Sequence, residues 1–303
     1  GSTNHTIHLI AIAAAAGVKI DWQDFSELSA IVPQLCRVYP NGTADVNHFH
    51  AAGGLGFVMR ELLGDGLLHE DVRTILGEGL GDFCREPKLV DGHLSWKPIA
   101  SDSLDEAVLR PAAKPFAPEG GMRVVSGNLG RAIVKVSAVD PKHHSITAPA
   151  RVFRTQQAFV DAFNAGALEQ DFVAVLSCQG PRANGMPELH KLTPYLGVLQ
   201  SRGFKVALVT DGRMSGASGK VLAAIQVTPE ALCGGLIAKV RDGDIIEIDA
   251  NTGTMMLAVD KPEEREAVVE TSPQFGLGRE LFGVFRDRAG PADSGASLFS
   301  EDQ

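Results

Sequence analysis

Two short apolar runs, 172–176 and 204–209, show no alternation between hydrophobic and polar positions. Strands that are buried on both faces of a parallel sheet have this pattern. The segment between them places leucines at helical spacing, begins at Pro187 and ends before Gly203, so it predicts a helix over 187–202. A strand–helix–strand unit brings the loops after both strands to one edge of the sheet, where open parallel sheets bind ligands.

The rest of the second half of the chain also has strand patterns. Apolar or alternating runs predict strands at 123–126, 132–138, 147–153, 244–249 and 254–259, with a helix at 156–165. The last two strands flank an Ala-Asn-Thr-Gly turn, which is typical of a hairpin.

The first 95 residues have a mainly helical pattern. An Ala-rich helix ends at Gly17 and could be capped by Thr3 or Asn4. Further helices are expected at 21–38, 46–63 and 71–83. A stretch rich in Pro, Ala and Gly at 97–121 marks a boundary. We therefore predict two domains, 1–108 and 109–303.

Composition narrows the class of protein. The net charge is −9, no basic stripe is present, and the chain has two Trp and two Tyr, which argues against a nucleic-acid partner. No apolar run reaches the length of a membrane span, and no signal peptide is recognised. The four cysteines form no CxxC motif, so we expect a reducing cytoplasm and no self-contained zinc or iron–sulfur site.

The loop 211–220 after the second buried strand is the first candidate for chemistry. Ser215 lies in its Gly-rich sequence, where a hydroxyl usually satisfies nearby backbone and less often acts in catalysis. A phosphate-binding P-loop does not fit, because Met214 replaces a required glycine and Val221 replaces the Ser or Thr. The backbone amides of 216–219 could still form an anion site beside Lys220.

Other polar residues each have a structural alternative. Glu188 follows a proline at a predicted helix start, where it could serve the helix dipole or bind a hard metal ion. His5 and His8 are one turn apart, but surface histidines are the more common explanation. The polar cluster at 45–50 is explained by helix capping, with substrate contact as the alternative. Lys135 is expected to face outward, with a cation that lines a cleft as the alternative.

These motifs together resemble the iron–sulfur dehydratase family shared by dihydroxy-acid dehydratase and 6-phosphogluconate dehydratase. The matching segments are Gly-Ser-Thr-Asn-His at 1–5, Tyr-Pro-Asn-Gly at 39–42, Asp-Val-Asn-His-Phe at 45–49, Ser-Gly-Asn-Leu-Gly-Arg at 126–131, Asn-Gly-Met-Pro-Glu-Leu-His-Lys at 184–191, Val-Thr-Asp-Gly-Arg-Met-Ser-Gly at 209–216, Thr-Pro-Glu-Ala with Gly-Gly at 228–235, and Val-Arg-Asp-Gly-Asp-Ile-Ile at 240–246. Within the family, the forms at 127–132 and 184–190 are similar to those of the phosphogluconate branch.

The resemblance implies an α/β architecture, in which the helical remainder of an amino-terminal α/β domain precedes a β-barrel-like α/β domain with flanking helices. It implies dehydration of 6-phosphogluconate in the Entner–Doudoroff pathway, by a homodimer that uses an iron–sulfur cluster, expected to be 4Fe-4S, and Mg²⁺. By similarity, Ser215 is the base that removes the C2 proton and Glu188 is a magnesium ligand. Substrate contacts are expected from Arg213, Lys220, Ser218 and Asn4, and the phosphate is sought at Arg131, Arg182, Lys191, Arg213 or Lys220.

Two departures from the family pattern stand out. The cluster-binding cysteines and the remaining magnesium ligands precede the Gly-Ser-Thr-Asn motif in related enzymes, and Cys36, Cys84, Cys178 and Cys233 do not lie in those motifs. The chain therefore resembles the second half of the enzyme and is expected to be inactive alone. The other departure is Gln226, where relatives tend to carry histidine. Two alternatives stay open: a dehydratase of an unphosphorylated sugar acid or branched dihydroxy acid, and a non-catalytic dimerisation fragment.

Overall fold

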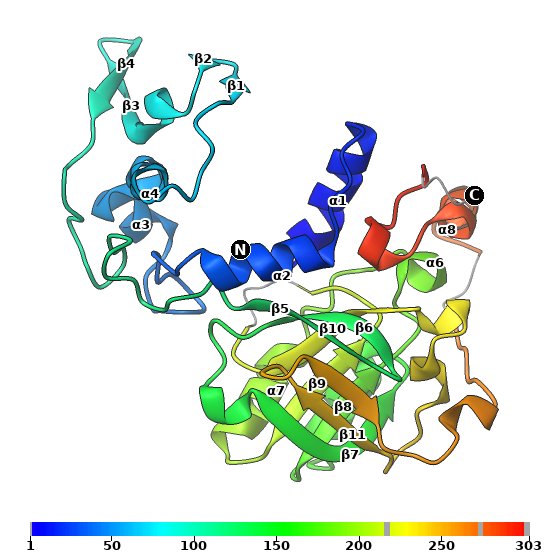
Figure 1. The fold of residues 1–303 in the computed structure, drawn as a ribbon. Coiled ribbons are helices and arrows are strands. Elements are labelled where there is room, and N and C mark those ends of the chain that lie inside the picture. The colour runs from blue at the N-terminus through cyan, green and yellow to red at the C-terminus, as the bar shows by residue number, and fades with distance from the viewer. Residues whose placement is uncertain (1, 215–218, 272–274, 300–303) are drawn as a thin grey trace. The chain divides into compact units, whose positions relative to one another are not determined.

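The computed structural model describes residues 2–214, 219–271 and 275–299 (Figure 1). The chain divides into two compact units. The barrel unit comprises Gly1–Glu27 and Gly121–Gln303, and the small unit comprises Leu28–Gly120. The first 27 residues thus pack with the barrel, while the predicted domains 1–108 and 109–303 stay a prediction. No helix within the described ranges is long and apolar enough to cross a bilayer.

A closed barrel of eight strands forms the centre of the barrel unit, in the order β10-β6-β5-β12-β11-β7-β8-β9. The strands are β5 (Met122–Gly127), β6 (Gly130–Lys135), β7 (Ser145–Phe153), β8 (Phe172–Leu176), β9 (Val206–Thr210), β10 (Leu222–Thr228), β11 (Ile245–Asp249) and β12 (Thr254–Leu257). The expected mixed α/β fold with a barrel-like sheet and flanking helices is confirmed. The expected antiparallel hairpin of the last two strands is also present.

The parallel part of the barrel runs through β7, β8, β9 and β10. Every residue of β8 and β9 is buried, which explains why neither strand alternates in sequence. The register pairs Leu176 with Thr210, so the two strands end side by side. Their following loops therefore start from the same edge, as predicted.

The helix between β8 and β9 is shorter than predicted. α6 (Pro181–Asn184) is a single turn, and α7 (Leu192–Ser201) starts well after Pro187. Between them, Glu188 forms a parallel bridge with Arg213, and the Leu189 N–H donates to the Arg213 carbonyl at 3.1 Å. Gly185 and Met186 have positive φ, which is also incompatible with a helix. The predicted helix start was wrong because a tertiary backbone contact replaced the first helical turns.

Among the residues that the structure describes, five helices flank the barrel, and Figure 1 shows α1, α6 and α8 on the same side of it. Besides α6 and α7 they are α1 (His5–Ala15), α5 (Gln156–Asn164) and α8 (Gly283–Arg288). α2 (Trp22–Ile31) begins in the barrel unit, where Trp22 is fully buried and its indole N–H donates to the Thr6 carbonyl at 3.0 Å. It ends before Pro33 rather than at residue 38, because a proline disfavours helical backbone in the residue before it.

The small unit contains two helices and two short hairpins, α3 (Val46–Ala52), α4 (Gly54–Gly64), β1 (Arg73–Thr74), β2 (Gly77–Glu78), β3 (Arg85–Val90) and β4 (His93–Pro98). The expected helix over 46–63 is split at Gly53, whose φ of 138° is outside the helical region. The expected helix over 71–83 is wrong. β3 and β4 meet at Asp91–Gly92, and both residues have positive φ, as a tight hairpin turn requires.

Short 3-10 helices complete the described structure. They are η1 (Gly81–Cys84), η2 (Pro141–His143), η4 (Ala231–Cys233), η5 (Leu236–Lys239), η6 (Pro262–Glu264), η7 (Arg279–Phe282) and η8 (Ala292–Ser294). Of these, η7 and α8 follow each other directly and carry two arginines that matter for the site described below.

The barrel closes tightly at Gly127, where a side chain has no room. A Cβ atom there would lie 2.0 Å from the Met255 carbonyl oxygen. We predict that Gly127→Ala lowers the free energy of unfolding by about 1–3 kcal/mol, as overpacking typically does. Gly197→Ala is the control, because that position is in the interior of α7 with nothing within 4 Å. It should raise stability by about 0.5–1 kcal/mol. Equal urea midpoints for both variants would contradict the close approach.

Candidate functional site

A buried carboxylate joins the loops at the carboxyl ends of the parallel strands. Asp211 is fully buried and follows β9 directly. Its Oδ2 accepts the N–H of Cys178 at 3.0 Å and of Ala231 at 3.0 Å, and its Oδ1 accepts the N–H of Gln179 at 2.8 Å. Burial raises the pKa of Asp211, while the three N–H donors favour its ionised form. The loops after β8, β9 and β10 are thus held around one side chain.

Glu188 and Arg213 meet in this region through both backbone and side chains. Arg213 Nη1 donates to Glu188 Oε2 at 2.6 Å, and Arg213 Nε donates to the Met186 carbonyl at 2.7 Å. The Glu188 side chain is 31% exposed, yet its Oε1 is buried without a hydrogen-bond partner among the described residues. A buried carboxylate oxygen with no donor is an acceptor that lacks its ligand.

That oxygen fits a hard metal ion such as Mg²⁺, which prefers carboxylate oxygens. One carboxylate is not a complete site, however. Within the described ranges no three His, Cys, Asp or Glu side chains are grouped so that they could hold a metal ion. The free cysteines also have different environments, since Cys178 is buried and Cys233 is exposed. The described residues therefore fit one magnesium ligand and do not fit a cluster site.

The first turn of α1 is anchored to the loop that leads to residue 215. Thr3 Oγ1 donates to the Met214 carbonyl at 2.8 Å. Gln226 is fully buried; its Oε1 accepts from Thr6 Oγ1 at 2.9 Å and its Nε2 donates to the Thr3 carbonyl at 3.0 Å. The Gln226 backbone N–H also donates to the Gly212 carbonyl at 2.8 Å. Gln226 therefore joins two motifs more than 200 residues apart in sequence, a role that the sequence did not indicate.

Asn4 lies at the amino-terminal end of α1 but does not cap it with its side chain. Thr3 does not cap it either, because its hydroxyl bonds to Met214. The expected side-chain cap is therefore wrong. Asn4 Oδ1 is instead buried without a partner among the described residues, near the loop that Thr3 contacts.

Not all expected site residues can be placed. Ser215 and Ser218 lie outside the described residues. Lys220 is exposed, and its carbonyl accepts a hydrogen bond from Gln200 of α7 at 3.0 Å. Of the other cations considered for phosphate binding, Lys191 is exposed, Arg131 pairs with Asp293 at 3.4 Å and Arg182 donates to the Asp287 carbonyl at 2.6 Å.

Lys135 differs from the expectation of an outward-facing charge. It is half-buried at the end of β6 and lines a cavity of about 20 Å³ together with Thr3, Met214 and Val221. Burial lowers the pKa of the Lys135 ammonium group. Residues from distant segments, Thr3 and Met214, line the same cavity, so a position that alternates in sequence like an exposed one is partly covered.

The polar cluster at 45–50 has the structural role expected for it. Asp45 Oδ1 accepts the N–H of Asn47 at 2.9 Å and of His48 at 3.1 Å, and the His48 side chain completes a capping box at the start of α3. His5 and His8 are both exposed on α1 and belong to no metal-binding group within the described ranges.

Glu230 is a buried acid that the sequence reading missed. It is 6% exposed, and both of its carboxylate oxygens accept the N–H of Arg182, at 3.1 and 3.2 Å. Burial and the nearby Asp211 carboxylate raise its pKa to about 7. The Thr-Pro-Glu-Ala segment was recognised as a motif, but only the fold shows that its Glu is enclosed beside a second acid. Glu230 therefore holds its proton under conditions in which an exposed Glu is ionised.

Family models match most of the chain. The dihydroxy-acid/6-phosphogluconate dehydratase amino-terminal model matches residues 1–83, and the corresponding carboxyl-terminal model matches residues 107–296. The barrel and the loops at its edge therefore lie within a known class of dehydratase. This chain is a member of the dihydroxy-acid/6-phosphogluconate dehydratase family, an iron–sulfur dehydratase family.

Individual relatives agree with the family assignment. The chain is 59% identical over 99% of its length to a phosphogluconate dehydratase of Pseudomonas aeruginosa, and 55% identical over 99% to one of Escherichia coli K12. It is 39% identical over 87% of its length to a dihydroxy-acid dehydratase of Sulfurisphaera tokodaii. The matched regions are 50%, 50% and 45% of those proteins, so the chain spans about half the length of its relatives.

The raised pKa of Glu230 predicts a pH-dependent stability. The folded state holds this proton up to about pH 7, whereas an unfolded Glu releases it near 4.5. The free energy of unfolding that depends on this proton is therefore fully present below about pH 4.5. It is lost as the pH rises towards 7, and the total loss is roughly 3 kcal/mol. The side chain in Glu230→Gln cannot ionise. The free energy of unfolding of this variant, relative to that of the wild type, should therefore increase between about pH 5 and about pH 8.

Chemical denaturation at several pH values measures this difference. Glu247→Gln, at an exposed position on β11, is the control and should follow the wild type in parallel. Parallel curves for Glu230→Gln as well would show that Glu230 titrates as an ordinary acid.

Proposed function

We propose that the protein containing this chain is a hydro-lyase that converts 6-phospho-D-gluconate to 2-dehydro-3-deoxy-6-phosphogluconate, a step of the Entner–Doudoroff pathway. The observation that supports this substrate most directly is the higher identity to relatives named phosphogluconate dehydratase, 55–59%, than to the dihydroxy-acid dehydratase, 39%. A cytoplasmic location and a homodimeric state belong to the same proposal.

In this proposal Ser215 takes the proton from C2 of the substrate, and the hydroxyl group leaves from C3. The departing hydroxyl takes up a proton and becomes water, and the resulting enol tautomerises to the 2-keto product. A serine hydroxyl needs strong stabilisation of its alkoxide to act as a base at neutral pH. The backbone supports this role because Thr3 fixes the Met214 carbonyl, one residue before Ser215.

Glu188 is proposed as a magnesium ligand through its unpartnered Oε1. Bound there, Mg²⁺ would supply positive charge that favours oxyanions in the site. Arg213 holds the opposite oxygen at 2.6 Å, so it fixes the rotation of the carboxylate and directs Oε1 away from itself. The paired arginine also offsets part of the charge of Glu188, so this carboxylate alone does not make a complete cation site.

An iron–sulfur cluster, proposed to be 4Fe-4S, is expected of the family but does not fit the described cysteines. We therefore assign its binding to parts of the protein outside the described residues and derive no step through it. For the same reason we propose that these 303 residues alone lack dehydratase activity.

Ser215→Ala tests the proposed base. In the full-length protein with its cofactors, kcat for 6-phosphogluconate should fall roughly 10²–10⁴-fold, the usual contribution of a general base, with little change in KM. Formation of the 2-keto product measures the rate. Ser201→Ala, whose hydroxyl donates to the Gly197 carbonyl on α7, should behave as wild type. A Ser215→Ala enzyme with nearly normal kcat would remove Ser215 from this role.

Glu188→Gln tests the metal ligand. Loss of the anionic oxygen should raise the Mg²⁺ concentration needed for half-maximal activity of the chelator-treated enzyme, by roughly 10-fold or more. Glu169→Gln is the matched control, since Glu169 also pairs with an arginine, Arg202, at 2.8 Å, but is exposed. An unchanged Mg²⁺ requirement in Glu188→Gln, with the fold intact, would show that the carboxylate serves only its ion pair with Arg213.

A further inference from the structure

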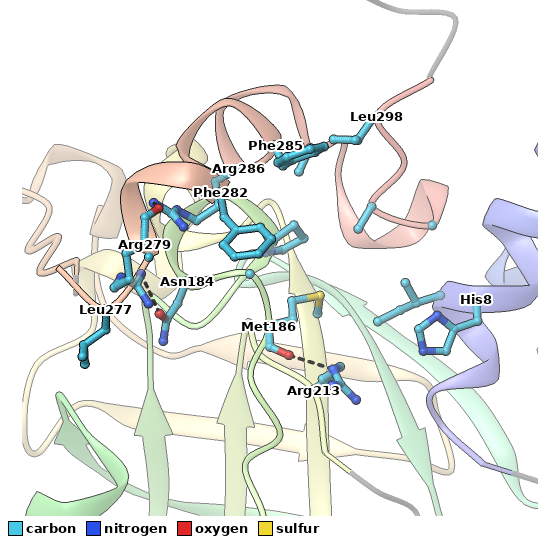
Figure 2. Close-up of a pocket in the computed structure, with 17 residues that line it drawn as sticks. His8, Asn184, Met186, Arg213, Leu277, Arg279, Phe282, Phe285, Arg286 and Leu298 are labelled. Carbon is cyan, nitrogen blue, oxygen red and sulfur yellow. Dashed lines mark hydrogen bonds between the residues drawn. The ribbon is translucent and has the colours of Figure 1, made fainter. Parts of the chain in front are cut away.

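A cavity of about 610 Å³ lies beside the Glu188–Arg213 pair within the barrel unit. Arg213 forms part of its wall, and η7 and α8 form the opposite part through Arg279 and Arg286 (Figure 2). We call it the arginine cavity after these three residues. His8 of α1 also lines it. Its volume is that of a small-molecule site.

The charge of this cavity has a single sign. Three arginines and one histidine line it, and none of its lining residues in the described ranges is Asp or Glu. The neighbouring cavity around Arg131, Arg182 and Arg288 differs, because three aspartates line it as well. The equal numbers of arginines and aspartates leave this second, balanced cavity without a net positive potential. The arginine cavity has a net positive potential, which favours an anion.

Arg279 is the arginine best prepared to bind a ligand. Its Nη2 donates to Asn184 Oδ1 at 3.1 Å, and Asn184 Nδ2 in turn donates to Gln179 Oε1 at 2.9 Å. The Arg279 carbonyl accepts from Arg286 Nη2 at 3.0 Å. Asn184 thus holds the guanidinium at Nη2, while Arg286 holds the backbone of Arg279. The Nε of Arg279 is buried without a hydrogen-bond partner among the described residues.

The other two arginines are engaged differently. Arg213 already uses two N–H groups on Glu188 and Met186. Arg286 is 8% exposed and supports η7 through the Arg279 carbonyl. The charge of Arg213 is offset by its ion pair with Glu188, whereas the Nε of Arg279 has no partner and is left for an anion. A planar guanidinium with a fixed orientation matches the oxygens of a phosphate group.

We propose that the arginine cavity binds the phosphate group of the substrate and that Arg279 is its main phosphate ligand. This inference rests on the proposed function, because it places the two ends of one substrate on either side of Arg213. The reacting carbons lie towards Glu188, and the phosphate lies towards η7. Selectivity for a phosphorylated sugar acid then comes from η7, a segment that follows the barrel strands. None of the site residues predicted from the sequence lies in this segment.

Arg279→Gln and Arg279→Lys in the full-length protein with its cofactors test the assignment. Arg279→Gln should raise KM for 6-phosphogluconate and the inhibition constant of inorganic phosphate roughly 10- to 100-fold, the range for a lost charge-assisted hydrogen bond. The kcat value and the inhibition constant of unphosphorylated gluconate should stay near wild type. Arg279→Lys keeps the charge without the planar fork and should show a smaller rise.

Arg288→Gln is the matched control, because Arg288 is close to Arg286 in sequence but lines the balanced cavity. It should leave all these constants unchanged. The assignment is overturned if Arg279→Gln leaves phosphate inhibition unchanged, if gluconate and phosphate inhibition weaken equally, or if Arg288→Gln gives the selective loss instead.

Phosphate binding can be separated from the proposed reaction. If the wild-type protein fails to dehydrate 6-phosphogluconate, the proposed function fails, but ³¹P NMR line broadening of inorganic phosphate still reports the cavity. Broadening that Arg279→Gln abolishes and Arg288→Gln retains supports the phosphate site by itself. Equal broadening in all variants rejects it.

Discussion

The site depends on the buried carboxylate of Asp211. A buried charge is unfavourable unless hydrogen bonds satisfy it, and here the N–H groups of Cys178, Gln179 and Ala231 do so. These donors come from the loops after β8 and β10, so satisfying one side chain fixes three chain segments at the end of the parallel strands. Glu230 is buried beside Asp211, and its pKa is raised by this burial and by the neighbouring carboxylate.

From this fixed edge, two chemically different regions extend from the Glu188–Arg213 pair. One contains the unpartnered carboxylate oxygen of Glu188, which suits a cation. The other contains Arg279 and the cationic wall of the arginine cavity, which suits an anion. Asn184 links the two regions, since it lies in the same motif as Glu188 and holds the Arg279 guanidinium. A substrate with a reactive polyol at one end and a phosphate at the other matches this arrangement.

Local patterns predicted the elements whose residues are buried uniformly or in strict alternation. The buried strands β8 and β9, their parallel pairing and the hairpin of β11 and β12 were all predicted. Prediction failed where a distant contact changed the local choice. The helix start at Pro187 was replaced by the bridge between Glu188 and Arg213. The helix expected over 71–83 failed for a local reason, because Arg73 and Glu78 pair across a short hairpin.

The sequence by itself determined the family, seven of the eight barrel strands and the candidate residues Glu188 and Ser215, because these follow from contiguous motifs and runs. The strand β10 was not predicted. Only the tertiary structure decided which polar atoms are buried without partners and which cations are already engaged. Gln226 and Lys135 illustrate this limit: one joins α1 to the loop before Ser215, and the other lines an enclosed crevice. Arg279 lies outside every motif, and its relation to Asn184, 95 positions earlier, exists only in the folded chain. Hydrogen bonding and burial depend on distances in space, which the order of residues does not contain.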